Sequence, residues 1–201
     1  MPYKRSLPLK HWLDARRKVI DTLASGHAHV GGIASGGPGR PLDESKPLAH
    51  AYLIVAVGQF QGFARDLHDL TITRLIDASG ASGGFKSILT DGMTNGRGID
   101  RGNATNGTMK SDFTGIGVPF DLSPYDAHWA NDKGAFETLI RFRNTLAHGN
   151  QKDLDNLLVG GTVKDTVSWA RSQLPVLNRY ARAMDKRVWD HLSTTTRKDP
   201  W

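Results

Sequence analysis

Three side chains that can bind an anion and move a proton lie close together between positions 141 and 150, where the chain reads Arg-Phe-Arg-Asn-Thr-Leu-Ala-His-Gly-Asn. Arg143 carries a permanent positive charge, Asn144 offers a neutral hydrogen-bond donor, and His148 can take up or release a proton near neutral pH. Apolar residues precede the segment at helical spacing, and Gly149 favours the left-handed conformation in which helices often end. We therefore expect these side chains in the last turns of one helix, where they would suit a phosphate or another anion.

The spacing of these residues divides them between two faces of the expected helix. At about 100° per residue, Arg141, Asn144 and His148 fall on one face. Arg143 falls among apolar residues, about 140° away from His148. One ligand can contact both only if the helix frays near its end, or if a second copy of the chain supplies one of them. Two interpretations need no ligand: Arg143 as a buried structural arginine, and His148 as a helix cap favoured by the helix dipole.

The segment from Arg143 to Gly149 resembles the signature of the HEPN superfamily, in which an arginine is followed, after four to six residues, by a histidine. Its Arg-Asn-x-x-Ala-His-Gly form is similar to the form in the group that includes the RiboL-PSP-HEPN domains. The long helical pattern from Tyr52 to Ile76 also resembles the second helix of that superfamily.

The resemblance implies a metal-independent endoribonuclease without a cofactor, in which Arg143, Asn144 and His148 are the catalytic residues. Histidine can transfer protons near neutral pH, and arginine supplies a planar, charged fork for phosphate oxygens. The 2′-hydroxyl of RNA would attack the neighbouring phosphate and leave a 2′,3′-cyclic phosphate and a 5′-hydroxyl. The resemblance further implies a homodimer, because one motif histidine per chain is short of the two proton transfers in this reaction, and two motifs would line one cleft.

HEPN ribonucleases often act as toxins or antiphage-defence effectors, and many are held inactive by a neighbouring antitoxin. The resemblance therefore implies RNA as a partner, together with a partner protein from a toxin–antitoxin or defence system. Two other functions remain open. One is a HEPN module without catalytic activity that binds RNA, a nucleotide or a partner protein, and the other is a structural helical protein without a ligand.

Three further residues are candidates to support the site. Arg141 shares the face of Asn144 and His148 and is expected to bind substrate. By position, Gln61 lies where relatives in the HEPN superfamily often carry glutamate, so it would orient a guanidinium or imidazole without supplying a charge. Asp66 is the expected charge partner of Arg143 or Arg65, with a surface ion pair as an equally good interpretation.

The composition favours one domain, residues 1–201, with an anionic partner. The net charge is +6 and the pI is about 9.7, and nucleic acid is a common partner of basic proteins. The chain has no cysteine, which excludes disulfides and thiolate metal sites. It has no run of eighteen apolar residues and no signal-peptide pattern, so we expect no membrane contact and a cytoplasmic location. His27 and His29 have no carboxylate or cysteine close by in sequence, and we expect no metal site there.

Helical periodicity predicts an all-α fold, and the HEPN resemblance implies that its helices form a four-helix, up-and-down bundle. The first expected helix runs from Leu9 to Ser25, and the second from near Asp43 to about Ala78. The third begins between Ser123 and Lys133 and ends at the motif. The fourth runs from about Lys164 to Ser193, with a kink at Pro175. Residues 80–124 are rich in Gly, Ser, Thr and Asn. They are expected to form an irregular insertion with one short helix near residues 85–93, which acts either as a lid or partner-binding segment or as a loop without function. Residues 151–161 are expected to form a short connection.

Overall fold

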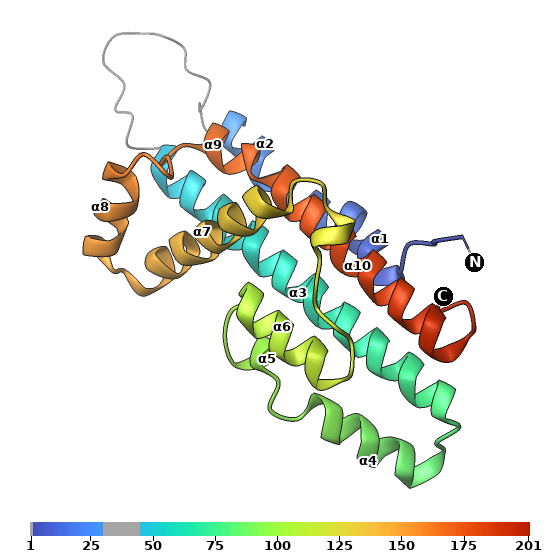
Figure 1. Ribbon diagram of the computed structural model, residues 1–201. Helices are drawn as coiled ribbons and strands as arrows, with labels where there is room; N and C mark the ends of the chain where they lie inside the picture. The colour runs from blue at the N-terminus through green and yellow to red at the C-terminus, as the bar shows by residue number, and fades with distance from the viewer. Residues whose placement is uncertain (1, 30–44) are drawn as a thin grey trace, which may run out of the picture.

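The computed structural model describes residues 2–29 and 45–201, with the backbone alone at residues 24, 26–29 and 45. Within these ranges every regular element is a helix and no strand is present (Figure 1). The predicted all-α class is therefore confirmed. The side chains of His27 and His29 lie outside the described residues.

The first helical segment consists of three elements that follow one another directly: α1 (Leu7–His11), the π-helical η1 (Trp12–Arg16) and α2 (Arg17–His29). Ser6 caps its start, because the Ser6 hydroxyl oxygen accepts a hydrogen bond from Leu9 N at 3.1 Å. The helix predicted over residues 9–25 is confirmed, and it extends beyond both predicted ends.

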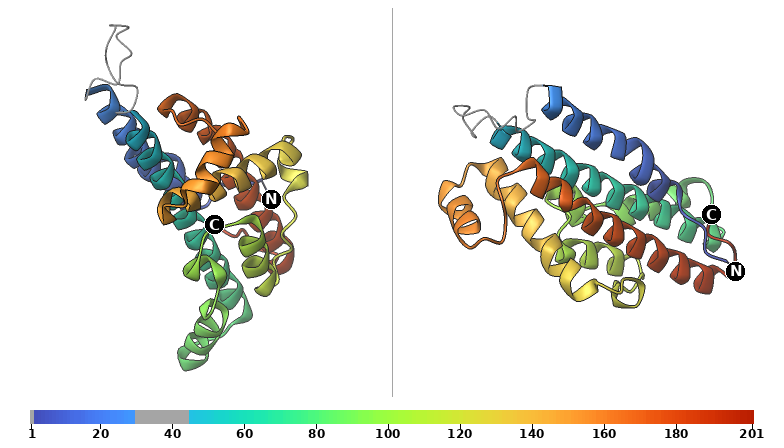
Figure 2. Two further views of the ribbon diagram at one scale, coloured as in Figure 1. Left: turned by 90° about the vertical axis from the view of Figure 1, so that its left-hand side faces the viewer. Right: turned by 90° about the horizontal axis from the view of Figure 1, so that it is seen from above.

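The central element is α3 (Ser45–Ser79), which contacts α2 on one side and the last two helices of the chain, α9 (Val167–Ser172) and α10 (Leu174–Thr196), on another. Seen from above, α2, α3 and α10 run side by side along the length of the molecule (Figure 2). The second predicted helix, from near residue 43 to about 78, agrees with α3 where the structure describes it.

Residues 80–124 differ from the expected irregular insertion, because they contain three helices: α4 (Gly83–Thr94), α5 (Gly98–Arg101) and α6 (Asn106–Gly115). The first of these matches the short helix predicted near residues 85–93. The other two are short and are fixed by side-chain caps rather than by periodicity. Thr105 Oγ1 accepts from Thr108 N at 3.0 Å, and the Asp112 carboxylate accepts from Gly98 N and Ile99 N at 2.9 and 2.8 Å. A 3₁₀ turn, η3 (Ser123–Tyr125), ends the insertion.

The third predicted helix is α7 (Trp129–His148), and it ends at the motif as predicted. Gly149 adopts the left-handed conformation, with φ 64° and ψ 26°. Asn150 N then donates to Thr145 O at 3.1 Å, which closes the helix end. The short connection expected over residues 151–161 is wrong, since α8 (Gln151–Val159) begins directly after Asn150, which caps it by accepting from Asp153 N.

The last predicted helix, about residues 164–193, is present as α9 and α10, which are separated at Gln173. Pro175 lies in the first turn of α10, where its missing N–H removes no intrahelical hydrogen bond. The proline therefore marks the start of a helix rather than a kink within one.

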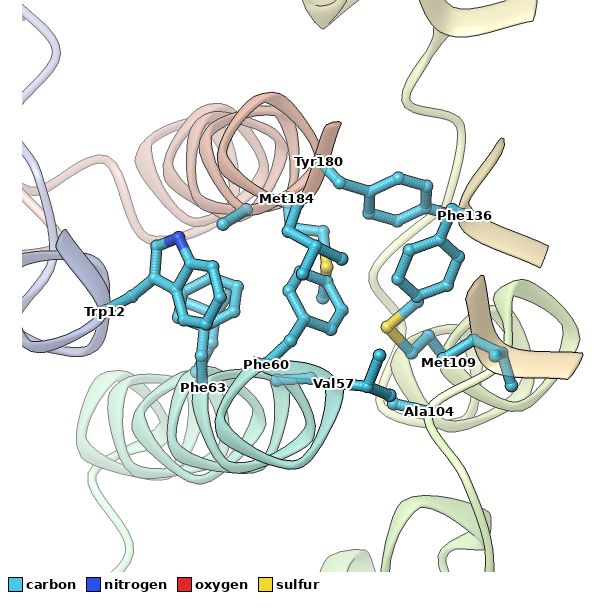
Figure 3. Close-up of a cluster of buried hydrophobic side chains, with 14 of the residues drawn as sticks. Trp12, Val57, Phe60, Phe63, Ala104, Met109, Phe136, Tyr180 and Met184 are labelled. Carbon is cyan, nitrogen blue, oxygen red and sulfur yellow. The ribbon is translucent and has the colours of Figure 1, made fainter. Parts of the chain in front are cut away.

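Side chains from η1, α3, α6, α7 and α10 meet in the core (Figure 3). The Phe60 ring lies 5.0 Å from that of Phe136, and Phe136 stacks on Tyr180 with ring centroids 4.3 Å apart. Met109 of α6 is fully buried beside them, so the insertion contributes to the core. No helix in residues 2–29 and 45–201 has the length and apolar content needed to cross a membrane.

Candidate functional site

A cavity of about 320 Å³ opens beside the last turns of α7. It is lined by the predicted face of α7, by the cap residue of α6 and by the first turn of α8, and its lining residues are Thr105, Glu137, Ile140, Arg141, Asn144, Thr145, His148, Asn150 and Asp153. The structure thus brings together three of the predicted site residues, Arg141, Asn144 and His148. Their side chains are placed at steps of three and four along one helix, which is why they share one face.

The end of α7 positions His148 at the surface. The helix remains regular through His148, and the left-handed Gly149 stops it there, so it does not fray near Ala147. His148 is exposed and lies in the last helical turn, where the helix dipole favours a positive charge. Its imidazole can therefore reach both a ligand in the cavity and solvent.

Arg143 does not line this cavity; it lies half-buried behind the cavity wall. Its Nη1 donates to Asn103 Oδ1 at 2.7 Å and to Asn144 Oδ1 at 3.3 Å. Its Nε is buried and has no acceptor among the residues that the structure describes. Within one chain the cation that faces the cavity is therefore Arg141, while Arg143 holds Asn144 and the segment before α6.

Glu137 was not foreseen at this site, although it lies on the same face of α7, one helical turn before Arg141. One of its carboxylate oxygens, Oε1, accepts from Asn106 N, the first amide of α6, at 2.9 Å. The Asn106 side chain in turn accepts a hydrogen bond from the Tyr180 hydroxyl. Burial raises the pKa of Tyr180 well above its ordinary value, and the Glu137 charge acts in the same direction, so this hydroxyl stays protonated and remains a donor.

The α8 side of the cavity is held by a reciprocal cap. Asn150 Oδ1 accepts from Asp153 N at 3.3 Å, and Asn150 Nδ2 donates to Asp153 Oδ2 at 2.7 Å. Sequence reasoning missed both residues because it did not predict α8. Since Glu137 and Asp153 are acidic while Arg141 is basic, the cavity presents hydrogen-bond donors and acceptors of both charges.

Gln61 and Asp66 lie elsewhere, which corrects their expected roles. Gln61 Nε2 donates to Ile99 O at 2.8 Å and to Gly102 O at 2.6 Å, so it holds α5 rather than a motif residue. Asp66 pairs with Arg16 Nη2 at 2.7 Å. The structure thus differs from the expected pairing of Asp66 with Arg143 or Arg65. The reason is that Arg16, at the end of η1, lies against that face of α3, so the alternative interpretation of Asp66 as a member of a partly exposed ion pair agrees with the structure.

No group of three or more His, Cys, Asp or Glu residues is placed to hold a metal ion within the described ranges, 2–29 and 45–201. No protein-family model, curated protein or solved structure matches the chain. A functional assignment therefore depends on the motif and on the geometry of the cavity.

Proposed function

We propose that this protein is a metal-independent endoribonuclease of the HEPN type, and that the cavity beside the end of α7 binds the phosphate at which RNA is cleaved. The observation that carries the proposal is the convergence of Arg141, Asn144 and His148 on one open cavity. A fixed positive charge, a neutral donor and a titratable imidazole are the groups that phosphodiester cleavage requires. The net charge of +6 favours RNA as the ligand.

In the proposed reaction, His148 takes the proton from the ribose 2′-hydroxyl. The 2′-oxygen then forms a bond to phosphorus, and the bond from phosphorus to the 5′-oxygen breaks. The leaving 5′-oxygen takes a proton from a second acid, so the products are a 2′,3′-cyclic phosphate and a 5′-hydroxyl. Arg141 and the Asn144 amide would stabilise the charge on the non-bridging oxygens during the transfer.

A homodimer would supply the second acid. Each cavity has one histidine among its lining residues, and His148 lies exposed at the end of α7, where a second copy can approach it. Two cavities joined across a two-fold axis would place two imidazoles at one phosphate. The same arrangement would let Arg143 act in a composite site although it does not face the cavity of its own chain.

The proposed fold is a HEPN-like four-helix, up-and-down bundle. Its four members would be the α1–α2 segment, α3, α7 and the α9–α10 segment, with α4, α5 and α6 as an insertion between the second and the third. The packing of α2, α7, α9 and α10 on α3 supports this correspondence.

We place the activity in the cytoplasm, in a toxin–antitoxin or antiphage-defence system with a partner protein that restrains cleavage. What supports this setting is the resemblance of the segment from Arg143 to Gly149 to HEPN toxins and effectors.

One observation favours the alternative of a HEPN module that binds RNA, a nucleotide or a protein without cleaving. Arg143, the arginine of the motif, donates to two amide oxygens and is absent from the cavity lining. If no second copy completes the site, the cavity retains a phosphate-binding face without a full set of proton-transfer groups.

The test is incubation of the purified protein with end-labelled RNA in EDTA, followed by analysis of the product ends. The expected products carry 2′,3′-cyclic phosphate and 5′-hydroxyl groups. RNA binding without cleavage would support the alternative. Activity that EDTA abolishes and magnesium or manganese restores would overturn the metal-independent mechanism.

A further inference from the structure

One terminal nitrogen of Arg143 connects the insertion to the candidate site. Arg143 Nη1 donates to Asn103 Oδ1 at 2.7 Å and to Asn144 Oδ1 at 3.3 Å. Since a guanidinium has only donors, both amides must turn their oxygens toward it. The Asn144 NH₂ group therefore points away from Arg143, and it is the donor that this side chain can offer to the cavity it lines.

Asn103 is held in place from the α3 side. It follows Gly102 directly, and Gln61 Nε2 of α3 donates to Gly102 O at 2.6 Å and to Ile99 O at 2.8 Å. The Ile99 side chain is fully buried in the core. These contacts hold the backbone within α5 and directly after it, next to Asn103.

A second set of contacts closes the other side of the same segment. The Asp112 carboxylate accepts from Gly98 N and Ile99 N at 2.9 and 2.8 Å. His68 Nε2 donates to Asp112 O at 3.2 Å, and His68 Nδ1 accepts from Arg97 Nη1 at 3.2 Å. The segment from residue 97 to 103 is thus tied to α3 and to α6 at several points, and it ends in the side chain that Arg143 contacts.

We propose that Asn103 is a positioning residue for the candidate site. Acting through Arg143, it sets the orientation of the Asn144 amide and hence the donor that the cavity presents to a phosphate oxygen. The identity of that ligand rests on the proposed function, whereas the orientation of the amide does not. Asn103 lies in the insertion, outside the motif, and no sequence pattern marks it.

The direct test is the NMR signal of the Asn144 side-chain NH₂ group, assigned by its loss in Asn144→Asp. Asn103→Ala should shift and broaden this signal, because Arg143 loses its nearer acceptor. Asn103→Asp keeps an oxygen acceptor for Arg143 and should leave the signal close to that of the wild type. Exposed Asn131, on the same helix as Arg143, provides the control Asn131→Ala. An unchanged Asn144 signal in folded Asn103→Ala overturns the proposal.

RNA cleavage provides the second readout. Asn103→Ala should lower kcat about tenfold in the wild-type background, as expected for the loss of one oriented hydrogen bond at a reacting charge. In an Asn144→Ala background the same substitution should have little further effect, because the group that Asn103 positions is gone. Equal losses in both backgrounds would show that Asn103 only supports the fold and would overturn the proposal. If the wild type does not cleave RNA, the proposed function fails, and the NMR comparison alone decides the role of Asn103.

Discussion

Arg141 and Arg143 are two positions apart, yet the structure gives them different surroundings. Arg141 is exposed and lines the cavity, whereas Arg143 is half-buried and holds two amide oxygens. We expect Arg141→Ala to leave the thermal midpoint unchanged and to lower kcat/KM for RNA cleavage about 10- to 100-fold, because the proposed phosphate site loses the positive charge of Arg141.

Arg143→Ala should behave differently, since it leaves the Asn103 and Asn144 oxygens without their donor. A loss of about 1–3 kcal/mol predicts a drop in the thermal midpoint of roughly 2–12 °C for a chain of this size, in addition to a loss of cleavage. Thermal unfolding and RNA cleavage measured on both variants check this contrast. Equal midpoints for the two variants would contradict the placement of Arg143 behind the cavity wall.

His68 should make folding depend on pH. Burial lowers the pKa of His68 and is the largest effect, partly offset by the hydrogen bond to the Asp112 carbonyl, which raises it. The Arg97 charge lowers the pKa further, and the Asp112 and Asp69 carboxylates raise it slightly. In the unfolded chain the pKa of His68 is about 6.5, so its imidazole takes up a proton below that pH. In the folded chain the imidazole takes up a proton only at a lower pH. The stability that neutral His68 contributes is therefore fully present above about pH 6.5 and is lost as the pH falls below it.

The measurement is the free energy of unfolding from pH 8 to pH 5 for the wild type and for His68→Gln, which keeps a side-chain donor for the Asp112 carbonyl. The wild type should lose more stability across this range than the variant. Parallel curves would show that His68 titrates normally in the folded protein.

At the scale of elements, Gly62 of α3 leaves room for the side chain of Arg16, the last residue of η1. A Cβ atom built on Gly62 would lie 2.3 Å from Arg16 Nη1, whereas one built on Gly58 has no atom within 4 Å. Arg16 uses this position to donate to Gln59 Oε1 at 3.0 Å and to Asp66 Oδ2 at 2.7 Å.

We therefore expect different results from two alanine substitutions one turn apart in α3. Gly58→Ala should raise stability by about 0.5–1 kcal/mol through helix propensity alone. Gly62→Ala should lose that gain, because the new methyl group displaces the Arg16 guanidinium from its two partners. Chemical denaturation of both variants checks this, and an equal increase in both would show that the Arg16 side chain does not depend on the space beside Gly62.

Helix α10 could be predicted from sequence because it buries a continuous apolar stripe, and α3 because apolar residues run along its whole length. The end of α7 could be predicted because Gly149 stops it. The short helix Gly98–Arg101 could not, because its start is fixed by the Asp112 carboxylate and four residues carry no periodic signal. Helix α8 does carry an apolar face at Leu154, Leu157 and Leu158, and the prediction of a connection over residues 151–161 overlooked it.

The candidate site also contains residues that could be predicted from sequence and residues that could not. The face with Arg141, Asn144 and His148 follows from helical geometry, and Glu137 could have been added by stepping back one turn. Thr105 reaches the cavity from a helix about forty positions away in sequence, and no local pattern indicates that contact. The roles expected of Gln61 and Asp66 were not met, because the neighbour that a polar residue of α3 contacts depends on how the helices cross.

For the whole molecule, we expect a homodimer that completes the proposed site with two copies of His148. Light scattering at micromolar concentration should give twice the 22.0 kDa mass of one chain. A variant with Glu in place of Ala147, which is exposed beside His148, should weaken the dimer and reduce cleavage together. A chain that cleaves RNA while it remains a monomer would contradict the composite site.

The most direct test of the central claim is RNA cleavage in EDTA by His148→Ala, with His11→Ala as the control because His11 is also exposed but lies on α1. Alanine cannot transfer a proton, so His148→Ala should lose about 100- to 10,000-fold in kcat, while its thermal midpoint stays at the wild-type value. His11→Ala should cleave like the wild type. Cleavage by His148→Ala at the wild-type rate would contradict the proposal that this protein is a HEPN-type ribonuclease.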